Sequence, residues 1–295
     1  MATKSIPGFY DSGQTDLPVL KPFSPQGYAY DEMYFVRWLA GIQLKYVAIV
    51  VLLWPAIAFA KSGSYGMSGA FAALWRWIPF ITFEGFFFNV LISIFSMAIG
   101  TFFGAVLGLS QLSNVPLVRR TAYVFTQLFR NSPWLVILFV VLLAFPFEIT
   151  VFGLIIPIPG WVKAVIGLSL PVMANISEIV RGAVNSVPSA QWEASESLAF
   201  NRTQTMWQII LPQCFKRMIP PWMNWYAILT MATPLCSLLG VGEIITYSRQ
   251  AMEAEDNYTE LLVPFYGYAL MLFFFYCYPI ARFTIALEKR FIVKL

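Results

Sequence analysis

The chain has 295 residues, of which 59% are hydrophobic and only 12% are charged. Soluble domains carry about 25% charged residues, so the composition excludes an ordinary soluble protein and indicates an integral membrane protein built of helices. The sequence has no histidine, the commonest general base and metal ligand. It also has no P-loop pattern and no nucleic-acid-binding motif. We therefore expect no catalytic residue, no metal site, no cofactor bound by this chain and no nucleic-acid partner.

The first residues, 1–43, are polar and contain several prolines, which favours an irregular segment. The first apolar segment, 44–60, begins too far along the chain to be the core of a secretory signal. We predict a cytoplasmic tail over 1–43 and a transmembrane helix over 44–60.

Apolar segments long enough to approach the roughly 20 residues of a membrane span recur along the chain. They cover residues 44–60, 86–110, 122–145, 161–180, 220–241 and 262–287. If the N-terminus lies in the cytoplasm, every lysine and arginine falls on the inner side except Lys61, Arg76, Lys163 and Arg249. The positive-inside rule therefore predicts an all-α membrane protein with six spans and with both termini in the cytoplasm.

The cysteines are isolated in sequence and fall in or beside apolar segments, at Cys214, Cys236 and Cys277. This spacing favours packing residues over disulfides or metal ligands.

A polar stretch, 186–212, separates the fourth and fifth apolar segments. Pro188 and Ser189 are typical of the first turn of a helix. Asn201, with Gln204 three residues later, predicts a capping box at the start of a second helix. Leu211-Pro212 is expected to end that helix and to open the next element. Two short helices held on one side of a membrane are typical of a docking surface.

Three elements in this stretch resemble the EAA motif of ABC importer permeases. They are Glu193-Ala194-Ser195, Ala199 and Ile209-x-Leu211-Pro212, at the family's spacing. Ser195 stands where the motif has its second alanine, and Ala199 stands where it has a glycine. Both replacements are small. The resemblance implies that 181–217 is a cytoplasmic coupling loop that docks in a cleft of an ATPase. The residues assigned to that contact are Ser189, Gln191, Trp192, Glu193, Ala194, Ser195, Leu198, Ala199 and Phe200.

Glu193 has two interpretations. Its carboxylate can pair with a basic group of the ATPase, or it can stabilise the start of its own helix through the helix dipole. Pairing with the ATPase is the favoured interpretation.

Further motifs are similar to the polar-amino-acid subfamily of these permeases, the histidine, glutamine and arginine type. They include Glu178-x-x-Arg181-Gly182, Arg130-x-Ser132-Pro133 and Pro220-Pro221-x-x-Asn224. The resemblance implies a five-helix type I ABC importer core over 80–292, with the first span as an added helix.

The same resemblance implies a permease in the bacterial cytoplasmic (inner) membrane that moves an amino acid or a derivative by alternating access. Its expected partners are an ABC ATPase dimer that binds ATP and Mg, a second permease subunit, with a heterodimer favoured, and a periplasmic solute-binding protein.

Polar side chains within spans are costly and therefore informative. Glu178 is expected to pair with Arg181, three residues on. Asn89, Asn175 and Asn224 are candidates for a substrate pathway, although hydrogen bonds between helices are the favoured role for each. Glu243 suits either an extracellular gate or a hydrated interface position.

The fifth span departs from the subfamily at positions that bear on substrate. Met231 and Thr233-Pro234-Leu235 stand where relatives carry a lysine and Thr-Ser-Leu, and Ile137 replaces a common glutamine. Fewer polar groups in the membrane favour a second permease that holds the substrate, or a less polar or larger substrate.

Two other function classes remain as alternatives. A secondary transporter or channel without an ATPase gives no reason for the polar stretch 186–212. A membrane-embedded enzyme requires a cluster of acid, base or nucleophile at one depth, and the sequence assembles none.

Overall fold

The computed structural model describes residues 66–151, 154–256 and 258–291, and the structural statements below concern these residues. The predicted tail over 1–43 and the predicted helix over 44–60 lie outside them. The first helical run comprises α3 (Met67–Phe80), the π-helical turn η3 (Ile81–Phe86) and α4 (Phe87–Ser110). The run starts well before residue 86, where the sequence analysis placed its beginning. Ala70, Ala73 and Leu74, at helical spacing, are buried and explain the early start.

The third apolar segment, 122–145, is not one straight helix but is bent within its length. Helices α5 (Pro116–Arg130) and α6 (Trp134–Ala144) meet at 106°. The Asn131 side chain donates to the Gln127 carbonyl at 2.8 Å, and Ser132 Oγ donates to the Leu128 carbonyl at 2.6 Å. These side chains satisfy carbonyls at the end of α5, and the proline that follows cannot continue its hydrogen bonding.

A β-hairpin follows α6 and corrects the expectation of an all-α fold. Strand β1 (Glu148–Val151) pairs with β2 (Leu154–Pro157) in antiparallel register, with Ile149 opposite Ile156. Three of the four residues of β1 and two of the four of β2 are β-branched, which favours this conformation.

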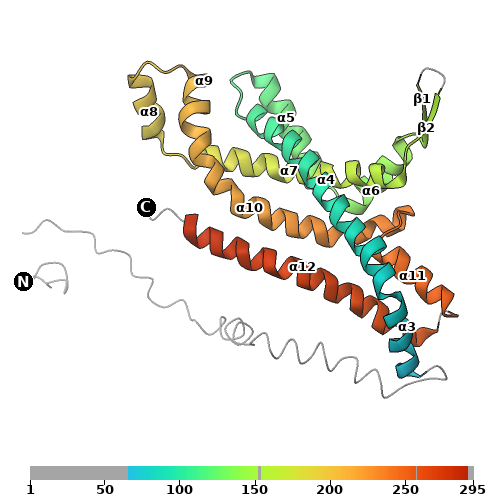
Figure 1. Ribbon diagram of the computed structural model, residues 1–295. Coiled ribbons are helices and arrows are strands. Elements are labelled where there is room, and N and C mark those ends of the chain that lie inside the picture. Colours follow the sequence, from blue (N-terminus) through green and yellow to red (C-terminus); the bar gives the residue numbers. More distant parts are fainter. Residues whose placement is uncertain (1–65, 152–153, 257, 292–295) are drawn as a thin grey trace, which may run out of the picture. The chain divides into compact units, whose positions relative to one another are not determined.

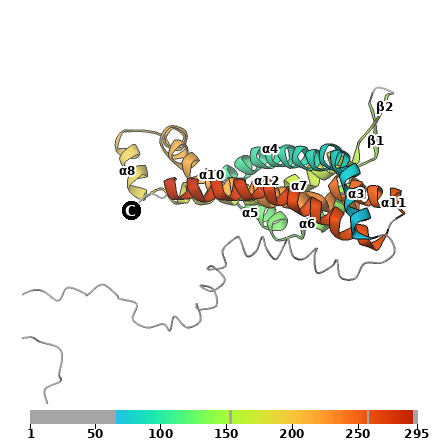
Figure 2. The same cartoon turned by 60° about the horizontal axis from the view of Figure 1, so that its bottom comes forward.

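Single long helices cover the fourth and sixth apolar segments, and both are long and apolar enough to cross a membrane. The fourth is α7 (Gly160–Asn185), and the sixth is α12 (Leu262–Phe291), which runs alongside α10 in Figures 1 and 2. The elements between them are α8 (Ser189–Ser197), α9 (Arg202–Gln204), the π-helical η4 (Thr205–Ile210), α10 (Leu211–Ala232), the 3₁₀ segment η5 (Thr233–Leu239), α11 (Ile244–Ala254) and the 3₁₀ segment η6 (Thr259–Leu261).

The core of the bundle is the contact between α4 and α7. Gly100, Gly104 and Gly108 repeat every four residues on α4 and face α7. A Cβ on Gly104 would lie 2.7 Å from the Cβ of Ile176 and 2.8 Å from the Met173 carbonyl oxygen. The two backbones approach this closely because glycine has no side chain, as in small-residue helix pairs of membrane proteins.

Lys163, which the charge analysis placed on the outer side, is buried, with 1% of its surface exposed. Its Nζ donates to the Phe145 carbonyl at 3.1 Å and lies 3.6 Å from the centre of the Phe147 ring. The lysine of α7 thus closes the C-terminal end of α6, where backbone carbonyls lack partners within the helix.

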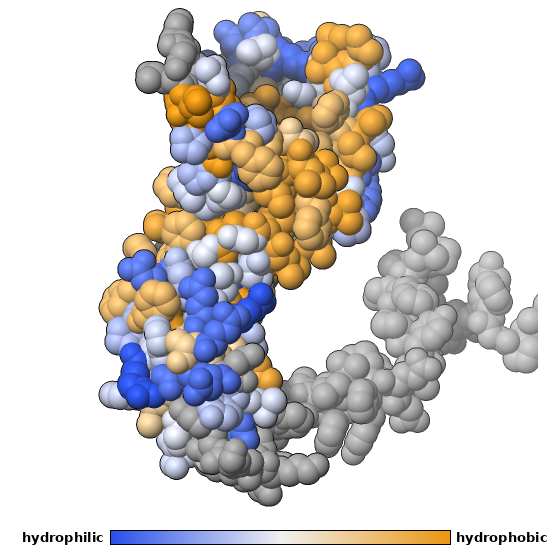
Figure 3. Space-filling model, turned by 90° about the vertical axis from the view of Figure 1, so that its right-hand side faces the viewer, coloured by the Kyte–Doolittle hydropathy of each residue, from blue (hydrophilic) through white to orange (hydrophobic). Residues whose placement is uncertain are grey.

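Three described helical stretches are long and apolar enough to cross a membrane, and the number rises to five if each of two bent pairs counts as one span. The second bent pair joins the continuous helix Arg202–Leu239 to α11 at 51°. Figure 3 shows apolar side chains gathered in the middle of one face, with hydrophilic groups toward both ends. This distribution fits a protein that lies across a bilayer.

Candidate functional site

The first arm of the predicted coupling loop is helix α8, which begins at Ser189, as predicted, with Pro188 as its N-cap. Glu193 and Leu198 are exposed on it, Leu198 to 71%. Ser195 points the other way: it is 2% exposed, and its hydroxyl donates to the Gln191 carbonyl at 2.7 Å. The motif's serine therefore supports the helix from within.

Ala199, at the position of the family's glycine, ends α8 in a left-handed conformation with φ of 59°. Its N–H donates to the Glu196 carbonyl at 2.9 Å, and the N–H of Phe200 donates to the Ser195 carbonyl at 3.1 Å. This pair of bonds defines a Schellman motif, whose left-handed residue is usually glycine because a Cβ is strained there. The geometry explains why a glycine suits this position.

The second arm starts with the predicted capping box. The Gln204 N–H donates to Asn201 Oδ1 at 2.8 Å, and the Asn201 N–H donates to Gln204 Oε1 at 2.9 Å. The next element, α10, opens at Leu211 as predicted, but the helical run does not end there, because it continues to Leu239. Pro212 falls where η4 gives way to α10, so its missing N–H coincides with a change of hydrogen-bond register.

The base of the loop is fixed to α7 and α10. Gln213 Nε2 donates to Gln191 Oε1 at 3.0 Å, and Arg217 Nη1 donates to the Ser186 carbonyl at 3.0 Å. A buried apolar cluster lies beneath, formed by Ala183, Val184, Val187, Ile210 and Cys214, with Trp192 packed against it. The loop is therefore a supported structural element whose ends are held against two long helices.

Between the two arms lies a cavity of about 430 Å³. Its lining combines aromatic, acidic and basic side chains, from Trp192, Glu196, Phe200, Arg202 and Thr205. Trp207 on the second arm is 62% exposed. Exposed large apolar groups around a concave, charged surface are typical of a protein-binding site.

Of the nine residues assigned to the ATPase contact, Ser195 is buried and Trp192 and Phe200 are partly buried. The others are exposed, namely Ser189, Gln191, Glu193, Ala194, Leu198 and Ala199. Glu193 lies beyond the first turn of α8, which contains no acidic residue, so its interpretation as a local helix cap is wrong. Glu196 and Trp207 were not predicted for this surface, because they lie beside the motif residues without belonging to the motif.

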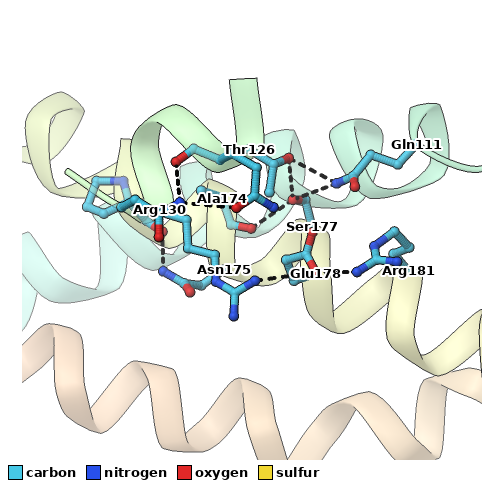
Figure 4. A network of polar contacts seen from close by, with 11 residues as sticks. Gln111, Thr126, Arg130, Ala174, Asn175, Ser177, Glu178 and Arg181 are labelled. Atoms are coloured by element: carbon cyan, nitrogen blue, oxygen red, sulfur yellow. Dashed lines mark hydrogen bonds and ion pairs between the residues drawn. The ribbon is translucent and has the colours of Figure 1, made fainter. Parts of the chain in front are cut away.

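A polar network lies where α4, α5 and α7 meet (Figure 4). Glu178 accepts a hydrogen bond from Arg181 at 2.6 Å, which confirms the predicted pair, and lies 3.5 Å from Arg130. Gln111 Nε2 donates to Thr126 Oγ1 at 2.9 Å and to Ser177 Oγ at 3.2 Å. The network joins three helices through side chains alone.

A second network lies at the break between η5 and α11. Asn89 Nδ2 donates to Thr233 Oγ1 at 2.9 Å and to Glu243 Oε2 at 3.1 Å, and Asn89 Oδ1 accepts from the Ile244 N–H at 3.0 Å. Glu243 also caps α11 by accepting from the N–H groups of Ile245 and Thr246. Asn89 therefore bonds between helices, as favoured, whereas the hydrated reading of Glu243 is wrong because it is fully buried.

The other two asparagines lie in different settings. Asn175 is buried, and its amide donates to the Pro171 carbonyl at 2.8 Å within its own helix. This hydrogen bond differs from the bond between helices that the sequence favoured. Asn224 is exposed on α10. The three cysteines are buried free thiols, as predicted for packing residues.

Comparison with known proteins places this arrangement in a family. Residues 100–288 match the family described as "Binding-protein-dependent transport system inner membrane component". The chain is 33% identical over 208 residues to the probable amino-acid ABC transporter permease protein YckA of Bacillus subtilis, covering 70% of this chain and 88% of that one. It is 30% identical over 207 residues to the L-cystine transport system permease protein TcyB of the same species, covering 70% and 84%.

A solved structure shares the fold. The crystal structure of an amino acid ABC transporter with histidines superimposes with a TM-score of 0.63 at 18% identity, covering 78% of this chain and all of that one. The motif, the supported loop and these similarities agree. The chain belongs to the binding-protein-dependent transport system inner membrane components, the permease subunits of ABC transporters.

Proposed function

We propose that the chain is the permease subunit of an ATP-driven importer that moves an amino acid or an amino-acid derivative across the bacterial inner membrane by alternating access. The relatives support the substrate class, since their names specify amino acids in general or L-cystine. The observation that carries the proposal is the coupling loop: a Schellman motif and a capping box shape it, α7 and α10 support it, and its apolar groups are exposed.

The exposed face of α8 docks on an ABC ATPase dimer, which binds the ATP and Mg that this chain does not. Glu193 pairs with a basic group there, while Leu198 and the cavity beside Phe200 receive apolar side chains. Hydrolysis then moves the loop, and α10 transmits the motion because the helix Arg202–Leu239 has no break.

The complete importer contains a second permease, in a heterodimer, and a periplasmic solute-binding protein. The chain crosses the membrane six times, with its first span over 44–60 outside the core of 80–292 and with both termini in the cytoplasm. The distribution of lysine and arginine supports this orientation.

The substrate pathway runs along the exposed face of α10. Asn224 and Met231 lie seven residues apart on one face, and both are exposed. One amide among apolar groups suits a substrate of modest polarity. Asn89, Asn175 and Glu243 serve the pathway from within the chain, where they hold the helices that border it.

Cysteine cross-linking tests the docking surface, because the native thiols are buried. The variant Ser197→Cys places a thiol on α8, and Thr150→Cys places one on the exposed β1 strand as a matched control. We expect a thiol cross-linker applied to native membranes to join an ATPase to position 197 and not to position 150, with mass spectrometry identifying the product. If no ATPase is captured at position 197, the docking assignment fails and the alternative of a secondary transporter or channel takes its place.

A further inference from the structure

A pocket of about 400 Å³ lies between the end of α4, the first half of α5 and the end of α7. Neither the residues assigned to the ATPase contact nor the pathway residues line it. Sites for small molecules in proteins commonly measure roughly 300–1,000 Å³. The pocket is lined by Gln111, Arg119, Arg120, Tyr123, Val124 and Arg181. Arg119 and Arg120 are exposed and have no acidic residue beside them in the lining. A concentration of guanidinium groups of this kind suits an anion.

One residue that lines the pocket carries a buried polar atom without a partner among the described residues. Gln111 is 5% exposed and uses its amide nitrogen on Thr126 and Ser177, as Figure 4 shows. Its Oε1 is buried and accepts no hydrogen bond from any described residue. A buried acceptor without a donor costs free energy, so it favours a ligand that brings a hydroxyl or ammonium group. The Nε of Arg181 is likewise buried without an acceptor among the described residues.

The third property of the pocket is its apolar border. Val124 lines the pocket and lies on one stripe of α5 with Leu117 and Leu128, which are 72% and 57% exposed. Binding of a small soluble anion buries none of this apolar surface, whereas acyl chains that cover it remove it from water, which is favourable. Arginines above an apolar helix face are the arrangement that binds lipid head groups between transmembrane helices.

We propose that this pocket binds the head group of an anionic glycerophospholipid of the phosphatidylglycerol type. Arg119 and Arg120 hold the phosphodiester, a head-group hydroxyl donates to Gln111 Oε1, and the acyl chains lie along the apolar stripe of α5. The pocket shares α7 with the coupling loop and shares Arg181 with the Glu178 network, so a bound lipid braces the helix that carries the loop.

Native mass spectrometry of the purified full-length chain tests the proposal. The chain is released from detergent in the presence of phosphatidylglycerol, phosphatidylcholine or inorganic phosphate. We expect phosphatidylglycerol adducts to survive at collision energies that remove phosphatidylcholine, with at least a tenfold excess. The double variant Arg119→Gln/Arg120→Gln should lose that excess. The variant Arg282→Gln/Lys289→Gln removes two exposed positive charges of α12 outside the pocket and should keep it.

Four results would overturn the proposal. Phosphatidylglycerol retained no better than phosphatidylcholine excludes a head-group site. Equal loss in both double variants assigns the effect to overall charge. Inorganic phosphate that displaces the lipid at equal concentration shows that the acyl chains contribute nothing and that the ligand is a soluble anion. A variant that binds lipid normally but no longer co-purifies with an ATPase assigns the arginines to a protein partner and also contradicts the proposal.

Discussion

The side-chain amide of Asn89 lies 3.1 Å from the carboxylate of Glu243, a residue 154 positions away that is fully buried. The amide nitrogen of Asn89 makes that contact, and the oxygen of the same amide accepts from the Ile244 N–H. Asn89 therefore satisfies two buried groups at the start of α11. Asn89→Ala leaves both without that partner, at a cost of about 1–3 kcal/mol for each unsatisfied group. We expect a lower midpoint of thermal unfolding of the purified chain, measured by tryptophan fluorescence.

The matched control is Asn224→Ala, because Asn224 is exposed on α10. It should leave the unfolding midpoint unchanged while reducing uptake of the substrate. An equal fall in the midpoint for both variants would contradict the structural role of Asn89.

The left-handed conformation of Ala199 yields a second prediction. A left-handed residue with a Cβ is strained by about 1–2 kcal/mol, so Ala199→Gly should slow amide hydrogen exchange in residues 195–200. Glycine also raises the entropy of the unfolded chain, which offsets part of this gain. Ala190→Gly, in the helical part of α8, should accelerate exchange instead. Faster exchange in both variants would refute the strain at position 199.

The exposed carboxylate of Glu193 yields a third prediction. Glu193→Lys should abolish substrate-stimulated ATP hydrolysis by the assembled importer and leave membrane insertion intact, because it places a positive charge against the basic partner group that we propose. Glu148→Lys makes the same change of charge at an exposed position of β1 and should retain coupling. Normal stimulation of ATP hydrolysis in the Glu193 variant would contradict the docking assignment.

The contact between α4 and α7 yields a fourth prediction. Gly104→Ala brings a methyl group within 2.7 Å of Ile176 and 2.8 Å of a backbone carbonyl, so the helices must separate. Overpacking of this kind costs about 1–3 kcal/mol. Gly267→Ala on α12 meets nothing within 4 Å and should be neutral or slightly stabilising, because alanine favours helix. The midpoints of thermal unfolding of the two variants provide the measurement. Equal midpoints would show that α4 and α7 can separate without loss of stability.

Much of the fold could be predicted from local signals. The capping box at Asn201 and the helix start at Ser189 depend on neighbouring residues alone, and both are confirmed. The bend at Pro133 was missed because an apolar segment satisfies the requirement for a span whether or not its helix is straight. The glycine repeat on α4 was visible in the sequence, but only the structure shows that all three glycines face one helix.

The candidate site was harder to predict. The motif identified the loop, yet the sequence could not show that Ser195 points inward or that Ala199 adopts a positive φ, because both depend on how α8 ends. Glu243 and Asn89 are brought together by tertiary packing, and no spacing in the sequence links them. The pocket beside Arg119 likewise requires three helices that are separate in the chain.

Lys163 has a consequence for the order in which the helices enter the membrane. Its ammonium group depends on the Phe145 carbonyl and the Phe147 ring, both of which lie at the end of α6 and are synthesised earlier. A lysine alone in hydrocarbon is costly, and here its acceptors are already present when it emerges. The geometry therefore favours insertion of α6 and α7 as a pair, in which the end of the first helix already binds the charge of the second.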